Sequence, residues 1–367
     1  FLLSLVGSEM CIRDRILTDE RAMSISAVWS CVRLISETVG SLPVHVYRRT
    51  DTGRESVEDH YLYRLFRESP NAMMTPMEFR EAMTMQLALW GNAYAKVDRD
   101  SKGVPVALTP LKADRMTPTR TAGGLTYHYQ EEKGTHVFAQ SSIFHLKGYS
   151  VDGVVGLSPL AYARHTLGIS ASADIYASKS FSQGGVPRGV LTVDRILTQE
   201  QREALKRIYT GISAKDSDGT WVLEAGVQWK PTQIPPDDMQ MLQSRAFQLA
   251  EVARIFRVPS FLINDTEKST SWGTGLEQTN LAFLTYTLRP YLTRWESTVS
   301  DSLLDRPGRR EYFIEHEVEG LLRADSAARA NFYSQMVQNG LYSRNEVRRK
   351  ENMPPVVGGD DLTAQVN

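Results

Sequence analysis

Cysteine is scarce in this chain of 367 residues, which contains only Cys11 and Cys31. Two cysteines cannot build the set of disulfides that holds small secreted domains together, so the sequence indicates a protein of a reducing compartment. Cys31 falls on the apolar face of a predicted helix. We therefore expect it to be a small buried hydrophobic residue.

Long apolar runs are also missing. A membrane-spanning helix needs about 20 apolar residues, but Glu9 closely follows the opening run Phe1–Val6. That run has no basic residues before it and is too short for a secretory leader. The sequence therefore predicts no membrane partner.

The first residues, FLLSLVGSEMCIRDR, have another interpretation. The codons that can encode Leu5–Asp14 resemble a transposon-end adapter used in DNA library preparation. We expect residues 1–15 to be a disordered sequencing scar and exclude them from the fold, with a natural disordered N-terminus as the alternative.

An excess of charge of one sign is absent too. The chain has 42 basic and 43 acidic residues and a pI near 6.7. Tight binding to nucleic acid without sequence preference needs many contacts from Lys and Arg to phosphates. The balance argues against such binding, but it permits a surface along which DNA passes loosely.

Motifs that carry chemistry are missing as well. The seven histidines are scattered, and His128, His136 and His145 fall on predicted strands without metal-binding spacing. No P-loop is present, GLSPL fits a helix start better than a nucleophile elbow, and GTGLEQ is too short for a dinucleotide fingerprint. The pair Asp237–Asp238 suits a helix start. The sequence thus assigns no catalytic, metal-binding or cofactor-binding residue.

Helices and strands are mixed in the first 150 residues. Apolar residues recur at helical spacing in a helix that ends near Pro43, and VHVYRR then alternates as a strand. Thr75 and Glu78 form a capping box for a second helix, which ends at Gly91. Further strands are expected in a hairpin around Asp100–Gly103 and in GLTYHYQ and THVFAQSSIFHLKGY.

Helices dominate after residue 157. Ser158 is predicted to cap a helix rich in small residues, which continues to Gly185. PRGVLTV is predicted to be a strand, and GTWVLEAGVQWKPTQI is predicted to make a further β pair. A helix over residues 238–257 then leads into the polar loop NDTEKSTSWGTG.

The last third is expected to be helical. One long helix is predicted from Leu276 to Asp305, with a kink at Pro290 because proline cannot donate a backbone hydrogen bond. The tail is predicted to be a helical hairpin. Gly340 ends its first helix, and Ser343 and Glu346 form a capping box for its second.

The order of the motifs is more specific than any one of them. It includes AVWSCVRLISETVGSLPVHVYRR, LALWGNAYAKVDRDSKGVPVALTPL, IFHLKGYSVDGVVGLSPL, FSQGGVPRGVL, RIFRVPSFLI, TYTLRPYL and GLYSRNEVRRKENMPPVVGGD. From about Leu17 to Asp361 the chain resembles the portal proteins of long-tailed double-stranded DNA phages and prophages. The resemblance implies an α+β portal fold with a mixed wing, a helical stem, a small clip, a long kinked helix and a helical crown.

The resemblance also implies a division of the chain. The expected parts are a wing over 16–157, a stem helix over 158–185, a clip over 186–235, a second stem helix over 236–263, a tunnel loop over 264–275, the long kinked helix and wing return over 276–323, and a crown and tail over 324–367.

The function implied by the resemblance is structural rather than enzymatic. Portal proteins form a ring, usually a dodecamer, at one capsid vertex. Double-stranded DNA is packaged and ejected through this ring, which contacts the large terminase subunit, the head–tail connector or adaptor, and the major capsid or scaffolding protein. The expected location is the virion, with assembly in the host cytoplasm.

Candidate residues follow from the expected parts. DNA-channel candidates in the tunnel loop are Lys268, Ser269, Thr270 and Ser271. Candidates on the clip that would face a partner are Arg188, Arg202, Lys206, Trp221, Trp229 and Lys230.

Two other functions remain open from the residues alone. One is an enzyme with a dispersed hydrolytic site, although the sequence names no nucleophile or metal ligand for it. The other is a structural ring or scaffold without a DNA channel. The charge balance and the polar loop are compatible with either.

Overall fold

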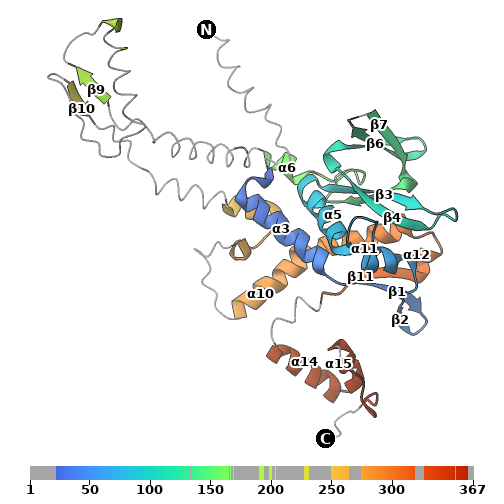
Figure 1. Cartoon of the computed structure of the whole chain (residues 1–367). Coiled ribbons are helices and arrows are strands. Elements are labelled where there is room, and N and C mark those ends of the chain that lie inside the picture. The colour runs from blue at the N-terminus through green and yellow to red at the C-terminus, as the bar shows by residue number, and fades with distance from the viewer. Residues whose placement is uncertain are drawn as a thin grey trace. The chain divides into compact units, whose positions relative to one another are not determined.

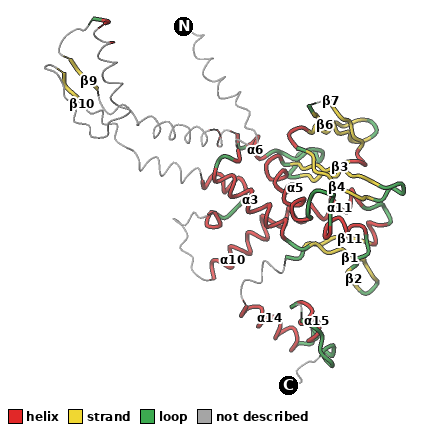
Figure 2. Tube along the Cα trace, in the orientation of Figure 1, coloured by secondary structure: helices red, strands yellow, loops and turns green. Residues whose placement is uncertain are grey.

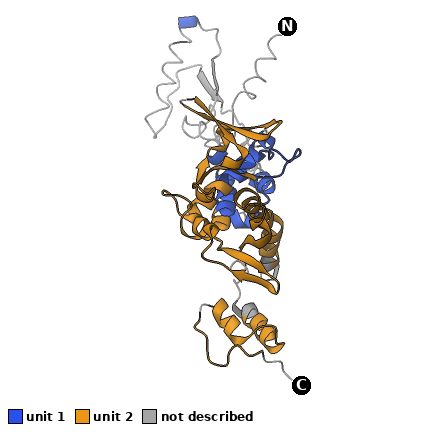
Figure 3. Cartoon of the chain, turned by 90° about the vertical axis from the view of Figure 1, so that its right-hand side faces the viewer, with its two compact units in different colours: residues 1–36, 85–93, 147–276 blue, residues 37–84, 94–146, 277–367 orange. Residues whose placement is uncertain are grey.

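The computed structural model describes residues 22–132, 134–164, 190–193, 227–230, 249–263, 274–318, 326–351 and 353–362, with residues 166, 168, 198–200 and 203 (Figure 1). The chain divides into two compact units. Unit 1 comprises residues 1–36, 85–93 and 147–276, and unit 2 comprises residues 37–84, 94–146 and 277–367 (Figure 3).

Helix α3 (Ser26–Ser41) has the apolar stripe that its sequence predicts. The four residues at helical spacing are fully buried, namely Val28, Val32, Ile35 and Val39. Cys31 is also fully buried, and burial raises the pKa of its thiol to about 12. The expectation that Cys31 is a buried hydrophobic residue is confirmed.

The first sheet forms in unit 2 with the strand order β11-β1-β2. Strand β1 (Val44–Thr50) alternates as predicted, since Val44 and Val46 are buried while His45 and Tyr47 are partly exposed. A tight turn leads to β2 (Gly53–Ser56), and β11 (Tyr312–His316) pairs antiparallel with the other edge of β1. The sheet thus joins segments about 270 positions apart in the sequence, as the pairing of Val44 with His316 shows.

Helix α5 (Pro76–Trp90) begins and ends where the sequence predicts. The Thr75 hydroxyl accepts from the backbone N–H of Glu78, and the Glu78 carboxylate accepts from the backbone N–H of Thr75 at 2.7 Å. Gly91 follows the helix with φ +67°, and a Cβ there would lie 2.0 Å from the Leu157 carbonyl oxygen. Glycine is therefore required for both its conformation and its close contact.

Two further three-stranded sheets follow α5 (Figure 2). The predicted hairpin is confirmed as β3 (Asn92–Arg99) and β4 (Pro105–Leu111), and β8 (Ile143–Lys147) lies on the other side of β3. The second sheet has the order β5-β6-β7, with β5 (Met116–Thr121), β6 (Gly124–Glu131) and β7 (Gly134–Ala139). Strand β5 was not predicted because Pro118 and its polar neighbours mask the strand pattern.

Trp295 lies at the centre of the core of unit 2. Its ring contacts Phe66 and Phe79 edge to face, with centroids 6.3 and 6.0 Å away, and it packs against Phe144 at 5.7 Å. The indole N–H donates to the Thr84 hydroxyl at 3.1 Å. This contact satisfies the polar edge of a side chain that is fully buried.

The long helical run is not one regular helix. It consists of α10 (Thr274–Ala282), the π-helical segment η5 (Phe283–Leu288) and α11 (Arg289–Leu303). The backbone N–H of Arg289 donates to the Leu284 carbonyl, five residues back. The predicted disturbance at Pro290 is therefore a π-helical turn that ends just before the proline, which has no N–H to place in the helix.

The C-terminal hairpin is confirmed as α14 (Ser326–Gln338) and α15 (Arg344–Lys350). Gly340 has φ +67° between the two helices, and Ser343 and Glu346 form the predicted capping box.

Short elements complete the described chain. They are α4 (Tyr61–Tyr63), the π-helical η1 (Arg64–Glu68), the 3-10 turns η2 (Ala113–Arg115), η3 (Gln140–Ser142) and η4 (Ser260–Ile263), α6 (Pro159–Tyr162), β9 (Val190–Val193), β10 (Val227–Lys230) and α12 (Gly308–Glu311). The Ser158 hydroxyl caps α6 as predicted, by accepting from the backbone N–H of Ala161. Most of the helix predicted to continue to Gly185 falls outside the described chain.

Candidate functional site

Most of the predicted site residues fall outside the part of the chain that the structure describes. This holds for the channel candidates Lys268, Ser269, Thr270 and Ser271, and for the clip candidates Arg188, Arg202, Lys206 and Trp221. Their roles stay predictions. Trp229 and Lys230 are the two candidates whose backbone is described, and both lie in β10.

Strand β9 confirms the strand predicted in PRGVLTV, but it pairs with β10, whereas the sequence analysis expected the β pair to form within GTWVLEAGVQWKPTQI. Strands β9 and β10 run antiparallel, with Trp229 opposite Leu191 and Lys230 opposite Val190. The two strands are about 35 positions apart in the sequence, and the clip role of this segment stays a prediction.

The segment before the predicted tunnel loop ends in a rigid helix cap. Residues 249–256 are helical, and Arg257 then adopts φ +58°. The backbone N–H of Val258 donates to Ala253 at 2.9 Å, and that of Arg257 donates to Arg254 at 3.2 Å. These bonds form a Schellman motif whose left-handed position usually carries glycine. An arginine here costs about 1 kcal/mol in backbone strain.

The loop 148–157 in unit 1 is tied to the end of α5. Both amide atoms of the Asn92 side chain bond to the backbone of Gly156, at 2.7 and 2.8 Å. A Cβ on Gly156 would lie 1.9 Å from the Gly91 carbonyl oxygen. Within the loop the Asp152 carboxylate accepts from two backbone N–H groups, which lowers its pKa to about 2. The base of this loop is therefore fixed, although Tyr149 and Val151 are exposed.

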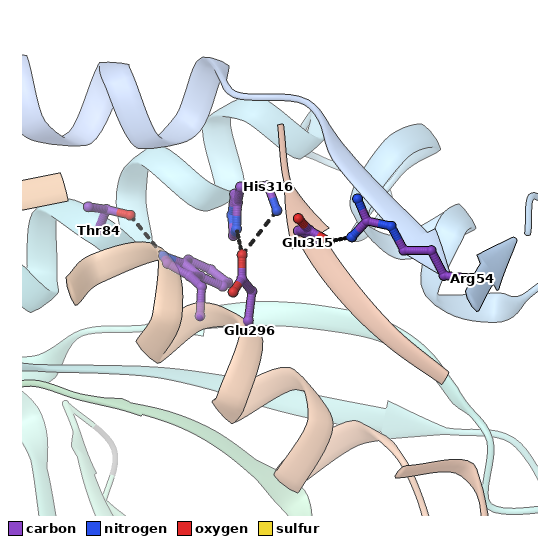
Figure 4. Close-up of polar contacts among 6 residues, drawn as sticks. Arg54, Thr84, Glu296, Glu315 and His316 are labelled. Atoms are coloured by element: carbon purple, nitrogen blue, oxygen red, sulfur yellow. Dashed lines mark hydrogen bonds and ion pairs between the residues drawn. The ribbon is translucent and has the colours of Figure 1, made fainter. Parts of the chain in front are cut away.

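A polar pair, the buried His316 and the partly exposed Glu296, joins α11 to β11 in unit 2 (Figure 4). The Glu296 carboxylate accepts from both the backbone N–H and the Nδ1 of His316, each at 3.0 Å. Burial lowers the pKa of His316, so its imidazole is neutral at neutral pH. Figure 4 also shows Arg54 paired with Glu315 at the adjacent position of β11.

Arg80 of α5 is a buried cation in the same unit. It donates to the Gly40 carbonyl at 2.6 Å, while its Nε and Nη1 have no hydrogen-bond partner in the described chain. Burial and the nearby Arg67 lower the pKa of Arg80 to about 10. Gly40 lies at the C-terminal end of α3, where carbonyl groups lack helical partners and attract cations. Arg80 thus caps one helix from another.

Neither polar cluster has the form of a catalytic site. The partners of His316 and Arg80 are structural groups, namely a carboxylate that also holds a backbone N–H and a helix-end carbonyl. Among the described residues, no three His, Cys, Asp or Glu side chains are placed to hold a metal ion. Within the same residues, no helix is long and apolar enough to span a membrane.

Comparison with known proteins decides the family. The model of the phage portal protein family matches residues 26–352. The chain belongs to the phage portal protein family. The match runs through the sheet of β1, β2 and β11, the π-helical turn before Pro290 and the start of the C-terminal hairpin, so it covers both units.

Individual relatives agree with the family match. The chain is 42% identical to the portal protein of Enterobacteria phage HK97 over 97% of this chain and 85% of that protein. It is 32% identical to the probable portal protein of Streptomyces phage phiC31, over 94% and 78% of the two chains.

A solved structure shows the same fold. A chain in the neck of an empty GTA particle, computed with C6 symmetry, matches with a TM-score of 0.65 and 25% identity, over 90% of both chains. The predicted α+β portal fold is confirmed.

Sequence reasoning missed these polar clusters. Arg80 and Glu296 lie in predicted helices, but the strand β11 that carries His316 was not predicted. Nothing in the sequence distinguishes a buried Arg80 or His316 from an exposed one. The pairing of β1 with β11 places His316 next to α11, and this pairing joins residues too far apart in the chain to be read from local patterns.

Proposed function

We propose that the chain forms a portal ring at the junction of head and tail in a phage or prophage particle. The observation that carries the proposal is the family match over residues 26–352, together with 42% identity to a phage portal protein over nearly the whole chain. The likeness to a chain from a particle neck supports the same location.

The parts of the ring follow from the order of the elements. We assign the wing to residues 16–157, the stem helices to 158–185 and 236–263, the clip to 186–235 and the tunnel loop to 264–275. The long helix with the wing return covers 276–323, and the crown covers 324–367. The β9-β10 pair within the clip and the π-helical turn within the long helix support these assignments.

The finer functions are part of the same proposal. The ring contains twelve copies, double-stranded DNA passes through its channel, and the clip contacts the large terminase subunit and later the head–tail connector. The capsid or scaffolding protein holds the ring at the vertex during assembly in the host cytoplasm. The protein hydrolyses nothing, because its role is to form a passage and a joint.

Electron microscopy of the purified full chain tests the ring. We expect closed rings with an open central channel, from which the number of copies can be counted. Co-expression with the scaffolding or capsid protein of the same genome is the second condition, because some rings need a partner to assemble. A chain that stays monomeric under both conditions would contradict the proposal.

Lys268→Glu tests the channel assignment. A carboxylate in the narrowest part of the channel would repel the phosphates of DNA, so packaging or retention of DNA should fall while ring assembly is unchanged. DNA per particle and ring yield are measured in parallel, with Lys102→Glu in the β3-β4 hairpin as the control charge reversal. Equal loss of rings and DNA would contradict the tunnel-loop role.

A further inference from the structure

The guanidinium of Arg80 has more hydrogen-bond donors than the described chain satisfies. Arg80 is only 5% exposed, and its Nη2 donates to the Gly40 carbonyl. Its Nε and Nη1 atoms are buried and have no hydrogen-bond partner among the described residues. A buried donor without a partner loses its contacts with water and gains nothing in return, so folded proteins pair nearly all such groups with protein or with ordered water.

His316 has the complementary group. The Glu296 carboxylate can only accept hydrogen bonds, so the His316 Nδ1 that contacts it at 3.0 Å carries the proton (Figure 4). In the neutral imidazole the other ring nitrogen, Nε2, is then a bare acceptor. Nε2 is also buried and has no partner in the described part of the chain. Unit 2 thus contains buried donors on one residue and a buried acceptor on another.

The end of helix α3 brings these two residues toward each other. Gly40 accepts from Arg80, and shortly after it the Pro43 carbonyl accepts from the backbone N–H of Glu317 at 2.9 Å. Glu317 directly follows His316 in the sequence. The same short segment therefore contacts the Arg80 guanidinium and the end of strand β11.

Helices α5 and α11 make a second, independent connection. Thr84 lies one turn after Arg80 on α5, and its hydroxyl accepts from the indole N–H of Trp295 at 3.1 Å (Figure 4). Trp295 is followed directly by Glu296, which holds His316. The contacts on both sides thus place Arg80 and His316 in the same part of the interior of unit 2.

The separation of Arg80 and His316 is larger than one hydrogen bond. Burial lowers the pKa of His316 most, and the positive charge of Arg80 lowers it further, so the two groups are close enough to interact. No hydrogen bond joins them directly, since Nε, Nη1 and Nε2 all lack partners among the described residues. Buried polar groups at such a separation are commonly bridged by an ordered water molecule.

We propose that a buried water molecule binds between Arg80 and His316, accepts from the guanidinium and donates to Nε2. An anion would accept from Arg80 but would face the lone pair of Nε2. A metal ion would bind Nε2 but would be repelled by the guanidinium. Water suits both sides because it donates and accepts. The site would link α3, α5 and β11, and it does not depend on the proposed function.

Crystallography of the full-length protein, at a resolution that shows ordered water, tests the site directly. We expect a density peak about 2.7–3.2 Å from His316 Nε2 and equally close to Nε or Nη1 of Arg80. A direct contact between the two residues, another protein group at that position, or no peak would overturn the inference. Crystals soaked in sodium bromide distinguish water from an anion, because an anomalous peak at the site would identify an anion and overturn the inference as well.

A double-mutant cycle is the second test, in solution. His316→Asn removes Nε2 but keeps a side-chain donor for Glu296, and Arg80→Met removes the donors but keeps an unbranched apolar side chain. Because one water joins the two groups, their combined effect on the unfolding equilibrium constant should differ by about tenfold from the product of the single effects. His316→Asn with Thr75→Ala, at the start of the same helix as Arg80, is the control, and its effects should multiply. Multiplying effects in the Arg80 cycle would contradict the bridge.

Discussion

Two regions of unit 2, the core around Trp295 and the C-terminal hairpin (residues 326–362), differ in how they bury apolar surface. Around Trp295, aromatic rings from four segments meet in a core from which water is excluded. In the C-terminal hairpin, the most buried side chains are those of Ser343 and Asn345, and Phe332 and Leu341 face water. Both regions have well-formed helices with capping boxes, so local helix signals do not distinguish them.

The difference distinguishes a region that is stabilised by contacts within one chain from a region that is not. The Trp295 region can be stable in a monomer because it buries large apolar side chains against its own chain. The hairpin has correct local structure without a core, so its stability depends on what it contacts. In the ring proposed above, such a region would complete its folding as the copies assemble.

Trp295→Ala tests the core around Trp295 and should have the largest effect on stability. It removes the central ring of the core and leaves the Thr84 hydroxyl without its partner, so the free energy of unfolding should fall by about 3–5 kcal/mol. Chemical denaturation followed by circular dichroism measures the change. Thr293→Ala, on the exposed side of α11, should change it little, and equal losses would contradict the assignment of the core.

The two capping boxes give a matched test. Thr75→Ala and Ser343→Ala each remove a hydroxyl that accepts from a backbone N–H, at 3.3 and 3.1 Å, and each should cost about 0.5–2 kcal/mol. For Thr75 the loss should appear in global unfolding. For Ser343 it should appear only as faster hydrogen exchange in residues 344–350. A global loss in both variants would mean that the hairpin folds with the core.

Arg257→Gly should raise stability. Glycine adopts φ +58° without strain, which gains about 1 kcal/mol, less the entropy that glycine adds to the unfolded chain. Arg257→Ala is the control, because it removes the same side chain but keeps the strain. Thermal unfolding compares the three proteins. Equal gains in both variants would show that the arginine side chain, and not the backbone, is the source of strain.

Acid should weaken the contact between α11 and β11. This is the smallest of the expected effects, and near neutral pH it should be slight. Burial lowers the pKa of His316 below its unfolded value of 6.5, so the unfolded chain takes up more protons as the pH falls through this range. The charged groups that act on His316 are Glu296, Arg80 and Glu315. The free energy of unfolding should decrease below pH 6.5.

His316→Asn isolates this dependence. Its side-chain amide can still donate to Glu296 but does not titrate. The difference in stability between the two proteins should therefore change between pH 7 and pH 5. A constant difference across that range would contradict a neutral buried His316.

Local elements could be predicted from the sequence because their signals are local. Gly91, Gly340 and the capping boxes at Thr75 and Ser343 mark helix ends through backbone bonds within a few residues. Val44 and Val46 reveal the buried face of β1 by simple alternation. The family could be recognised for the same reason, since ordered motifs survive along the whole chain.

Contacts between distant segments could not be predicted. Arg80 looks like an exposed arginine on an amphipathic helix, and its burial depends on the end of α3, 40 positions earlier. The π-helical turn before Pro290 replaces the simple kink because the chain rearranges one turn to keep its backbone bonds. The candidate channel residues, of which Lys268 is the main one, rest on the resemblance and await direct test.

Hydrogen exchange of the full-length protein, compared between assembled rings and dissociated monomers, tests the account most directly. The segments around Trp295 should be protected in both states. Amides of residues 326–362 should be protected in rings and exchange at least tenfold faster in monomers. Equal protection of the hairpin in both states would show that one copy completes it alone, and would contradict the account.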